Sequence, residues 1–243
     1  MEQASWVVCT YNRTPLTEEF MDHNLARLGN VDRPELIWID NGSTDGVERL
    51  WDKYKPDTII KRPNDCLSKS KNAAYNLCRG DWIIDLENDL FMPDNWLEEM
   101  LEYGEAIPNT GIMATMVAGW EQIVTLEYTT PKTIINGKEV IVTNSIGPRI
   151  FSSEVFKRCG CLTEFYGLYG SEDFEITRRA AKAGLTNYLI PSMVATHGGV
   201  GVWDSGEYRE NKTKALHGEK KNFTDEQIYF SPYAGRKSIN NFK

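Results

Sequence analysis

The chain has 243 residues, of which 41% are hydrophobic and 26% charged, as in ordinary globular proteins and unlike disordered or collagenous chains. No apolar run approaches the roughly 20 residues that span a bilayer, and the N-terminus has no signal-peptide pattern, so we expect a soluble, cytoplasmic protein. The formal net charge of −8 argues against binding nucleic acid through a broad basic surface, and the five cysteines, odd in number, are expected to stay reduced.

Strands and helices are predicted to alternate through the first part of the chain. Short runs rich in apolar and β-branched residues predict strands, at Ala4–Thr10, Glu35–Asp40, about Thr58–Lys61 and Trp82–Leu86. Apolar residues at helical spacing predict the helices between them, from Thr14 to Gly29, Val47–Tyr54 and about Ser68–Cys78. Such units form a parallel sheet with right-handed crossovers, which places all four carboxyl ends on one edge. Polar clusters at residues 10–13, 40–45 and 87–89 would meet there.

The pattern changes after Pro93. A helix is predicted at Asp94–Tyr103, and β-rich runs between Ile112 and Ser145 predict antiparallel or mixed strands with a hairpin turn at Asn136–Gly137. Two further helices and a strand are predicted, at Ser152–Arg158, Ser171–Ala183 and Asn187–Ile190. The sequence has no internal repeat and no low-complexity linker, so one continuous α/β domain is the simplest organisation.

Several acidic residues follow predicted strands, where ligands often bind, and each of them could instead have a purely structural role. Glu87 and Asp89 are two residues apart, so on an extended chain they face the same way and could hold a divalent cation together with a diphosphate. Equally, they could form an acidic loop that caps the next helix. Asp40, at a strand end, could accept hydrogen bonds from a ribose or base, or serve as a turn residue.

Later in the chain, Glu172 and Asp173 follow Ser171 at a predicted helix start. One of them could act as a general base, although a helix N-terminus favours acids in any case. His197 precedes Gly198 and Gly199, which would let the backbone approach a ligand, and imidazole binds ions such as Mn²⁺. A purely structural histidine is the alternative.

Five segments in this order resemble the family 2 glycosyltransferases, which have the GT-A fold: VVCTYNR, IWIDNGSTDG, the KNAA that begins at Lys71, GDWIIDLEND and GSEDFEITRRAAKAGL. The resemblance runs from about Trp6 to His197. It implies a Rossmann-like, mostly parallel central sheet flanked by helices, with a smaller mixed or antiparallel sheet on the acceptor side. Residues 1–208 would form a single domain, with a nucleotide-sugar half at 1–104, an acceptor and catalytic half at 105–208, and a basic extension at 209–243.

The resemblance also implies roles for individual residues. The nucleotide pocket would be lined by Thr10, Tyr11, Arg13, Asp40, Asn64 and Lys71. Glu87, Asn88 and Asp89 stand in place of the D-x-D motif that binds the donor diphosphate and a divalent metal, Mn²⁺ or Mg²⁺, with His197 as a later metal ligand. Asp173 would be the catalytic base, with Glu172 beside it. The implied reaction is a single inverting displacement on a nucleotide-sugar, transferring a hexosyl or pentosyl group.

Two departures and two alternatives qualify this prediction. Glu87 replaces the first Asp of D-x-D, which leaves Asp89 as the safer metal ligand, and Asp85 lies inside a strand where an apolar residue is expected. A nucleotidyltransferase is one alternative, but it would show a Gly-rich basic loop in place of TYNRTP. A catalytically silent sugar- or nucleotide-binding module is the other.

The acceptor stays open among a glycan, a lipid-linked sugar, a protein and a modified nucleic-acid base. It should be set by residues 113–149 and by aromatic side chains that could stack on sugars, Trp120, Phe165, Tyr166, Tyr169 and Trp203.

Overall fold

The computed structural model describes residues 4–118, 131–143, 148–164 and 172–198. The first part of the chain alternates as predicted, through β1 Ala4–Thr10, α1 Thr14–Leu25, β2 Glu35–Asp40, α2 Glu48–Tyr54, β3 Thr58–Lys61, α3 Leu67–Tyr75 and β4 Trp82–Asp85. Strand β1 pairs in parallel with both β2 and β4, and β2 pairs in parallel with β3. The predicted parallel sheet is therefore confirmed for the first four strands.

The second part of the chain adds strands of mixed direction. Its elements are β5 Leu90–Phe91, α4 Trp96–Ala106, β6 Thr110–Ala118, β7 Thr133–Ile135, β8 Lys138–Val142, β9 Arg149–Ser152, α6 Ser153–Cys159, α7 Glu172–Lys182 and β10 Thr186–His197. Strand β9 runs antiparallel to both β4 and β6, whereas β6 and β10 are parallel. The β7–β8 hairpin turns at Asn136 and Gly137, with φ of 48° and 82°. These angles are those of the predicted two-residue turn.

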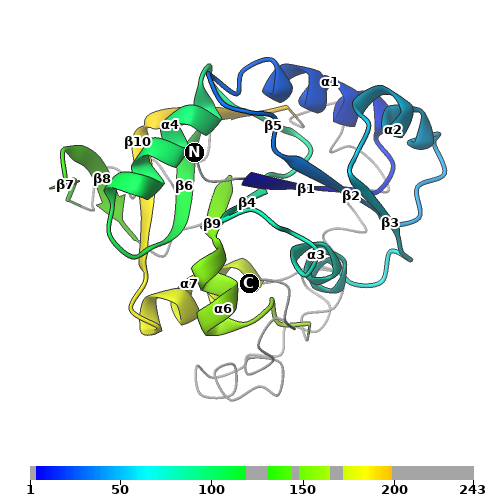
Figure 1. The fold of residues 1–243 in the computed structure, drawn as a ribbon. Coiled ribbons are helices and arrows are strands. Elements are labelled where there is room, and N and C mark those ends of the chain that lie inside the picture. The colour runs from blue at the N-terminus through cyan, green and yellow to red at the C-terminus, as the bar shows by residue number, and fades with distance from the viewer. Residues whose placement is uncertain (1–3, 119–130, 144–147, 165–171, 199–243) are drawn as a thin grey trace.

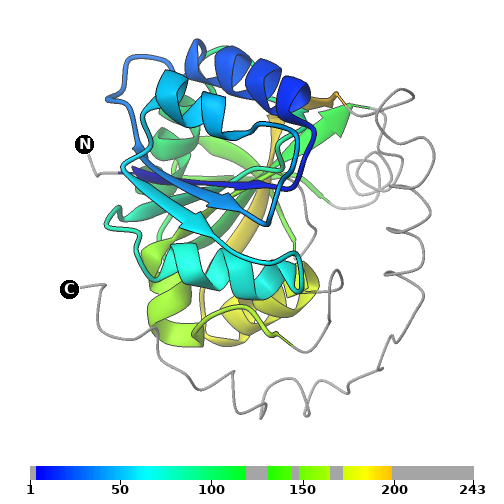
Figure 2. The same cartoon turned by 90° about the vertical axis from the view of Figure 1, so that its right-hand side faces the viewer.

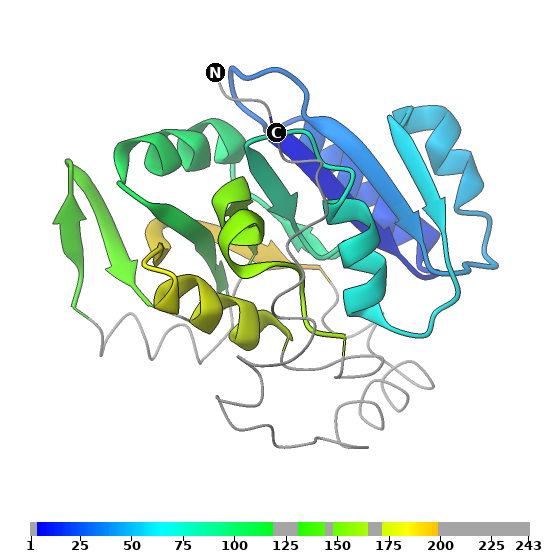
Figure 3. The same cartoon turned by 60° about the horizontal axis from the view of Figure 1, so that its bottom comes forward.

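The strands follow one path across the molecule, in the order β3-β2-β1-β4-β9-β6-β10-β8-β7, with β5 attached to β10. Figures 1 and 3 show the first-half strands at one end of this path and the β7–β8 hairpin at the other. The strands expected as a smaller acceptor-side sheet thus continue the parallel sheet, and β9 joins the two halves.

Helices cover both faces of the sheet because successive strand residues point to opposite sides. Trp6, Val8 and Ile84 pack on the face covered by α1, α2 and α4. Val7 and Ile83 belong to the opposite cluster, which is covered by α3, α6 and α7. Figures 1 and 2 show these two helical layers. The mostly apolar sequences of β1, β2 and β4 follow from this burial on two sides.

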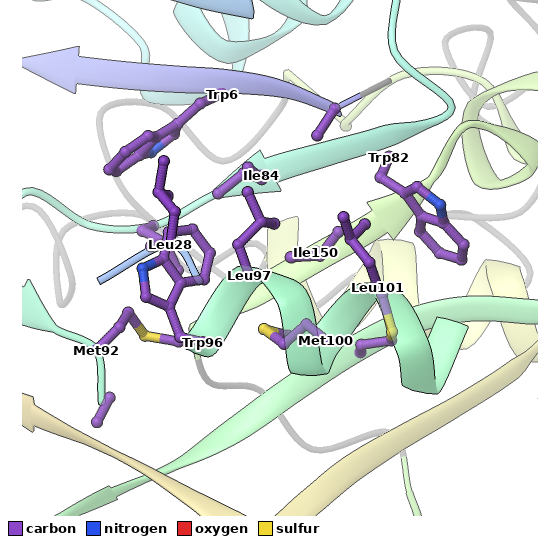
Figure 4. Close-up of a cluster of buried hydrophobic side chains, with 14 of the residues drawn as sticks. Trp6, Leu28, Trp82, Ile84, Met92, Trp96, Leu97, Met100, Leu101 and Ile150 are labelled. Carbon is purple, nitrogen blue, oxygen red and sulfur yellow. The ribbon is translucent and has the colours of Figure 1, made fainter. Parts of the chain in front are cut away.

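The packing of α4 shows how closely one layer fits the sheet (Figure 4). Trp96 and Trp6 meet edge to face, with ring centroids 5.7 Å apart, and Leu97, Met100 and Leu101 are buried on the same helix face. A Cβ at Gly104 would collide with the ring of Trp82, so this helix position requires glycine. No helix among the described residues is long and apolar enough to cross a membrane.

The structure differs from the sequence-based expectations in several details. Helix α1 begins at Thr14, with Arg13 as its N-cap residue, but it ends at Leu25 and not at Gly29. Leu77 is 41% exposed because α3 ends at Tyr75, before the predicted end of its apolar stripe. Strand β10 extends to His197, well beyond the predicted strand. The predicted acceptor aromatics Trp120, Phe165, Tyr166, Tyr169 and Trp203, and the extension 209–243, lie outside the described residues.

Candidate active site

The loops after β1 and β2 are joined at the carboxyl edge of the sheet. Asn12 and Arg13 are both left-handed, with φ of 53° and 63°, an arrangement that is uncommon for residues other than glycine. The Asn12 amide donates to Ser43 Oγ at 2.8 Å, and Asn12 Oδ1 accepts from the Thr44 amide at 2.8 Å. These two bonds hold the strained turn, so the predicted meeting of the first two polar clusters is confirmed.

Asp45 completes this junction at the start of α1. Its carboxylate accepts from the Thr14 amide at 2.8 Å and from the Thr14 hydroxyl at 2.7 Å. A carboxylate at this place satisfies a free N–H group and complements the helix dipole. The third polar cluster reaches the same region through Arg13, whose Nη1 lies 3.4 Å from Asp89 Oδ2.

The residues predicted to line a nucleotide pocket have different surroundings. Thr10 is buried, and its hydroxyl donates to the Ile39 carbonyl and accepts from the Trp38 indole, both at 3.1 Å. Its side chain therefore links β1 to β2 by hydrogen bonds. Asp40 is also buried and accepts from the Ser43 amide at 3.0 Å. By contrast, Tyr11 is 38% exposed at the same edge.

Two other predicted pocket residues lie around α3. Asn64 is half-buried in the turn that precedes this helix. Lys71 is buried within the helix, and its ammonium contacts Asp85, so it supports the site from the protein interior.

Asp89, Arg13 and His197 form what we call the Asp89 group. His197 Nε2 lies 3.6 Å from Asp89 Oδ2. Strand pairing produces this proximity, because His197 is opposite Leu90 where β10 meets β5. The Gly198 amide then donates to the Asp89 carbonyl at 2.7 Å. A Cβ at Gly198 would collide with the Phe91 ring, so this glycine permits a close approach within the protein rather than to a ligand.

The Asp89 group fits a divalent cation of the Mn²⁺ or Mg²⁺ type. A carboxylate oxygen and an imidazole nitrogen 3.6 Å apart could both contact one ion, with bonds of about 2.0–2.2 Å. The described residues contain no cluster of three or more metal-ligating side chains. Phosphate and water oxygens would therefore supply the other ligands, as is common where a metal bridges to a diphosphate.

The other two members of the predicted metal and diphosphate motif face elsewhere. Glu87 Oε1 lies 3.8 Å from Arg149 Nη2, so Glu87 faces the side chain of Arg149 and not the Asp89 group. The Asn88 side-chain amide donates to Thr17 Oγ1 at 2.7 Å, which ties the loop after β4 to α1. Asp89 is the one member that contacts His197.

Asp85, whose place inside a strand was unexplained, lies at the centre of a buried ionic cluster. Its carboxylate is 2.7 Å from Lys71 Nζ and 3.0 Å from Arg149 Nε. All three side chains are at most 5% exposed. Burial would raise the pKa of Asp85, but the charges of Lys71 and Arg149 outweigh it and lower this pKa to about 2. The cluster is therefore ionised in the folded protein.

Arg149 also reaches Asp173, which we describe with Glu172 as the Asp173 group. Arg149 Nη2 lies 3.7 Å from Asp173 Oδ1. Burial raises the pKa of Asp173, but the charge of Arg149, the hydrogen bond with Glu172 and the charge of Lys71 together outweigh it, so this pKa is lowered. The pKa of Glu172 is raised well above its ordinary value by burial and by the adjacent Asp173 carboxylate. At neutral pH the pair thus carries its negative charge on Asp173.

Sequence reasoning missed Arg149, which links the acids of the two halves. It lies at the end of the segment, residues 113–149, that we expected to set the acceptor. The available signal was Asp85, a charged residue inside a run that was predicted to be a buried strand, whereas the strand that contains Arg149 was not predicted. Unpaired charges are rare in such runs, so Asp85 implied a buried partner.

A sequence comparison matches residues 5–160, more than half of the chain, to the family described as Glycosyl transferase family 2. A search of curated proteins finds no match to the chain.

Solved structures resemble the fold at low identity. The mannosyltransferase PcManGT from Pyrobaculum calidifontis, in complex with GDP-Man and Mn²⁺, has a TM-score of 0.63 at 20% identity, covering 81% of this chain and 57% of that one. GalNAc-T7 with UDP, GalNAc and Mn²⁺ has a TM-score of 0.64 at 14% identity, covering 88% and 47%. TarS residues 1–349 from S. aureus, in complex with UDP-GlcNAc, has a TM-score of 0.60 at 12% identity, covering 93% and 69%.

These likenesses establish the GT-A fold. The chain spans 57% of the mannosyltransferase and 47% of GalNAc-T7.

Proposed function

Because the chain belongs to glycosyl transferase family 2, we propose that it transfers a hexosyl or pentosyl group from a nucleoside-diphosphate donor to an acceptor hydroxyl, with inversion at the anomeric carbon. Residues 1–104 would bind the donor, and residues 105–208 would bind the acceptor and supply the base. Residues 209–243 would form a basic extension outside this domain.

One observation carries the proposal: Arg149 lies within 3.8 Å of Glu87 and 3.7 Å of Asp173. Glu87 lies in the predicted donor-binding motif and Asp173 in the predicted base motif, from opposite halves of the chain. A displacement needs such an arrangement, because the leaving diphosphate and the base must stand on opposite sides of one sugar. The neighbouring structures with GDP-Man, UDP-GlcNAc and Mn²⁺ support a nucleotide-sugar donor and a divalent metal.

The chemistry follows from the charges of the two groups. Asp89 and His197 would hold the divalent ion, Mn²⁺ or Mg²⁺, whose charge stabilises the diphosphate that leaves. Asp173, ionised at neutral pH, would take the proton of the acceptor hydroxyl as its oxygen bonds to the anomeric carbon. The bond from that carbon to the phosphate oxygen breaks in the same step. Tyr11, which is exposed at the carboxyl edge of the sheet, would contact the nucleotide.

A donor screen tests the proposal. Purified protein is incubated with Mn²⁺ and a panel of UDP-, GDP- and dTDP-sugars, first with water as the acceptor and then with candidate glycan, lipid-linked, protein and nucleic-acid acceptors. We expect release of nucleoside diphosphate from one donor class, stimulated by the right acceptor and abolished by exhaustive chelation. Activity that survives chelation would contradict the metal role of Asp89 and His197. No release from any donor would contradict the proposed function.

A further inference from the structure

We infer that Arg149 is a positioning residue for Asp173, and that the buried pair of Asp85 and Lys71 holds Arg149 in place. This inference rests on the proposed function, because Asp173 needs a fixed orientation only if it acts as the base. It assigns a role to three charged side chains that the transfer mechanism itself does not use.

The rear of the guanidinium is fixed by the sheet. Asp85 and Arg149 are register partners in the antiparallel pair of β4 and β9, so their side chains leave neighbouring backbone positions. Arg149 Nε is 3.0 Å from Asp85 Oδ2, within hydrogen-bond distance. Lys71, from α3, contacts both oxygens of the same carboxylate, at 2.7 and 2.9 Å. The carboxylate that the guanidinium contacts from behind is therefore itself held by α3 on its other side.

The front of the guanidinium faces the site. Its Nη2 lies 3.7 Å from Asp173 and 3.8 Å from Glu87, which is longer than a hydrogen bond. Asp173 Oδ1 is buried, and among the described residues it has no hydrogen-bond partner. Glu172 shares a side-chain hydrogen bond with the Asp173 carboxylate, and Arg149 orients that carboxylate by charge while the lone pairs of Oδ1 stay available. A base requires this combination, because a lone pair already used in a hydrogen bond is less able to take a proton.

The charge balance explains why Lys71 is needed. If Asp85 paired with Arg149 alone, the two charges would cancel and Arg149 would attract Asp173 weakly. Lys71 neutralises Asp85 instead, so the guanidinium keeps its full charge for Glu87 and Asp173. The cluster as a whole sets two cations against three carboxylates, Asp85, Glu87 and Asp173. Glu87 is 46% exposed, so water can compensate this third carboxylate, whereas the buried Asp85 carboxylate is compensated by Lys71.

Three variants test the inference. Arg149→Met removes the guanidinium and leaves the Lys71–Asp85 pair neutral. Arg149→Lys keeps a positive charge but loses the planar guanidinium, which faces Asp85 and Asp173 at the same time. The double variant Asp85→Leu with Lys71→Met removes the rear support without leaving an unpaired charge from that pair. Arg79→Met is the matched control, because Arg79 pairs with Glu35, at 2.7 Å, at the opposite edge of the sheet.

The readout is the release of UDP from UDP-GlcNAc and of GDP from GDP-mannose in the presence of Mn²⁺, with thermal melts to verify folding. We expect kcat to fall about 100-fold in Arg149→Met, while the KM for the donor changes by less than about twofold. Arg149→Lys and the double variant should lose kcat to a smaller extent, again without a change in KM. Arg79→Met should behave as wild type.

The inference would be overturned by a kcat in Arg149→Met within about twofold of wild type, or by a loss expressed in KM rather than kcat. An equal loss in Arg79→Met would also overturn it, because the effect would then be general. If Arg149→Met does not fold, a wild-type kcat in both Arg149→Lys and the double variant would overturn the inference instead. A wild-type protein that releases nucleotide from neither donor would instead contradict the proposed function, and the inference with it.

Discussion

The Asp89 group and the Asp173 group lie at the same edge of the sheet but are held in different ways. In the Asp89 group, the carboxylate has cationic or imidazole neighbours at 3.4 and 3.6 Å, and its members are 12–16% exposed. In the Asp173 group, the carboxylate faces an arginine that is anchored by a buried ion pair.

The difference indicates a division of labour. Oxygen and nitrogen ligands that are spaced apart suit a cation and a diphosphate that bind and leave in each cycle. A carboxylate oriented by fixed internal charges suits a group that must be in the same place in every catalytic cycle. The first arrangement should therefore control donor binding, and the second should control turnover.

Asp173→Asn should separate the two groups most sharply. The amide cannot take a proton, so turnover should fall by about 10²–10⁴-fold, while donor affinity stays as in wild type. Steady-state kinetics and calorimetric titration with the donor would measure the two quantities. Wild-type turnover in this variant would refute the assignment of Asp173 as the base and favour a silent binding module.

Asp85→Asn tests the support of the Asp173 group through stability. Removing one partner of a buried ion pair leaves uncompensated charges of Lys71 and Arg149, so we expect a loss of about 3–5 kcal/mol in the free energy of unfolding.

Asp85→Leu with Lys71→Met is the matched comparison, and it should cost much less because no charge of the pair is stranded. Urea denaturation measures both variants. An Asp85→Asn protein as stable as wild type would show that the buried cluster is not held as described.

The sequence predicted those features that depend on nearby residues. The alternation of β1 to β4 with helices, the turn at Asn136 and the α7 start at Glu172 each follow from local patterns of apolar and turn residues. The proximity of Asp89 and His197 had been expected only from the family resemblance, and the strand pairing of His197 with Leu90 provides it.

Other features could not be predicted, because they depend on the register between distant strands. Asp85 contacts Arg149 because β9 pairs antiparallel with β4. No local sequence pattern determines that pairing. Thr10 is a similar case. Its hydroxyl bonds to Ile39 and Trp38 inside the sheet, although the motif alone suggested a pocket residue.

Asp89→Asn should affect donor binding more than turnover at saturating donor. Loss of the carboxylate charge weakens the predicted metal contact, so we expect a higher KM for the donor and a higher Mn²⁺ concentration for half-maximal activity. His197→Gln should shift both quantities in the same direction but less, because the carboxylate remains. Metal titrations at several donor concentrations would measure this. A change confined to kcat would reverse the proposed division between the groups.

Glu172→Gln should have the smallest effect, and the size of this effect depends on pH. The pKa of Glu172 is raised in the folded state, so above its unfolded value the folded protein retains a proton that the unfolded chain releases. Folding stability is therefore reduced as the pH rises from about that unfolded value, near 4.3, toward the folded one. Glutamine removes this penalty, so the variant should gain stability at pH 7 relative to wild type and gain little at pH 4. Thermal melts at the two pH values measure it, and a loss at pH 7 would contradict the assignment of charge within the pair.

The most direct test of the account is the donor dissociation constant of Asp173→Asn and of Asp89→Asn, measured by calorimetry with Mn²⁺ and the donor that wild type turns over. We predict a wild-type constant for Asp173→Asn, despite its lost turnover, and clearly weaker binding for Asp89→Asn. Equal weakening in both variants, or weakening in Asp173→Asn alone, would contradict the claim that the two groups at this edge divide donor binding from turnover.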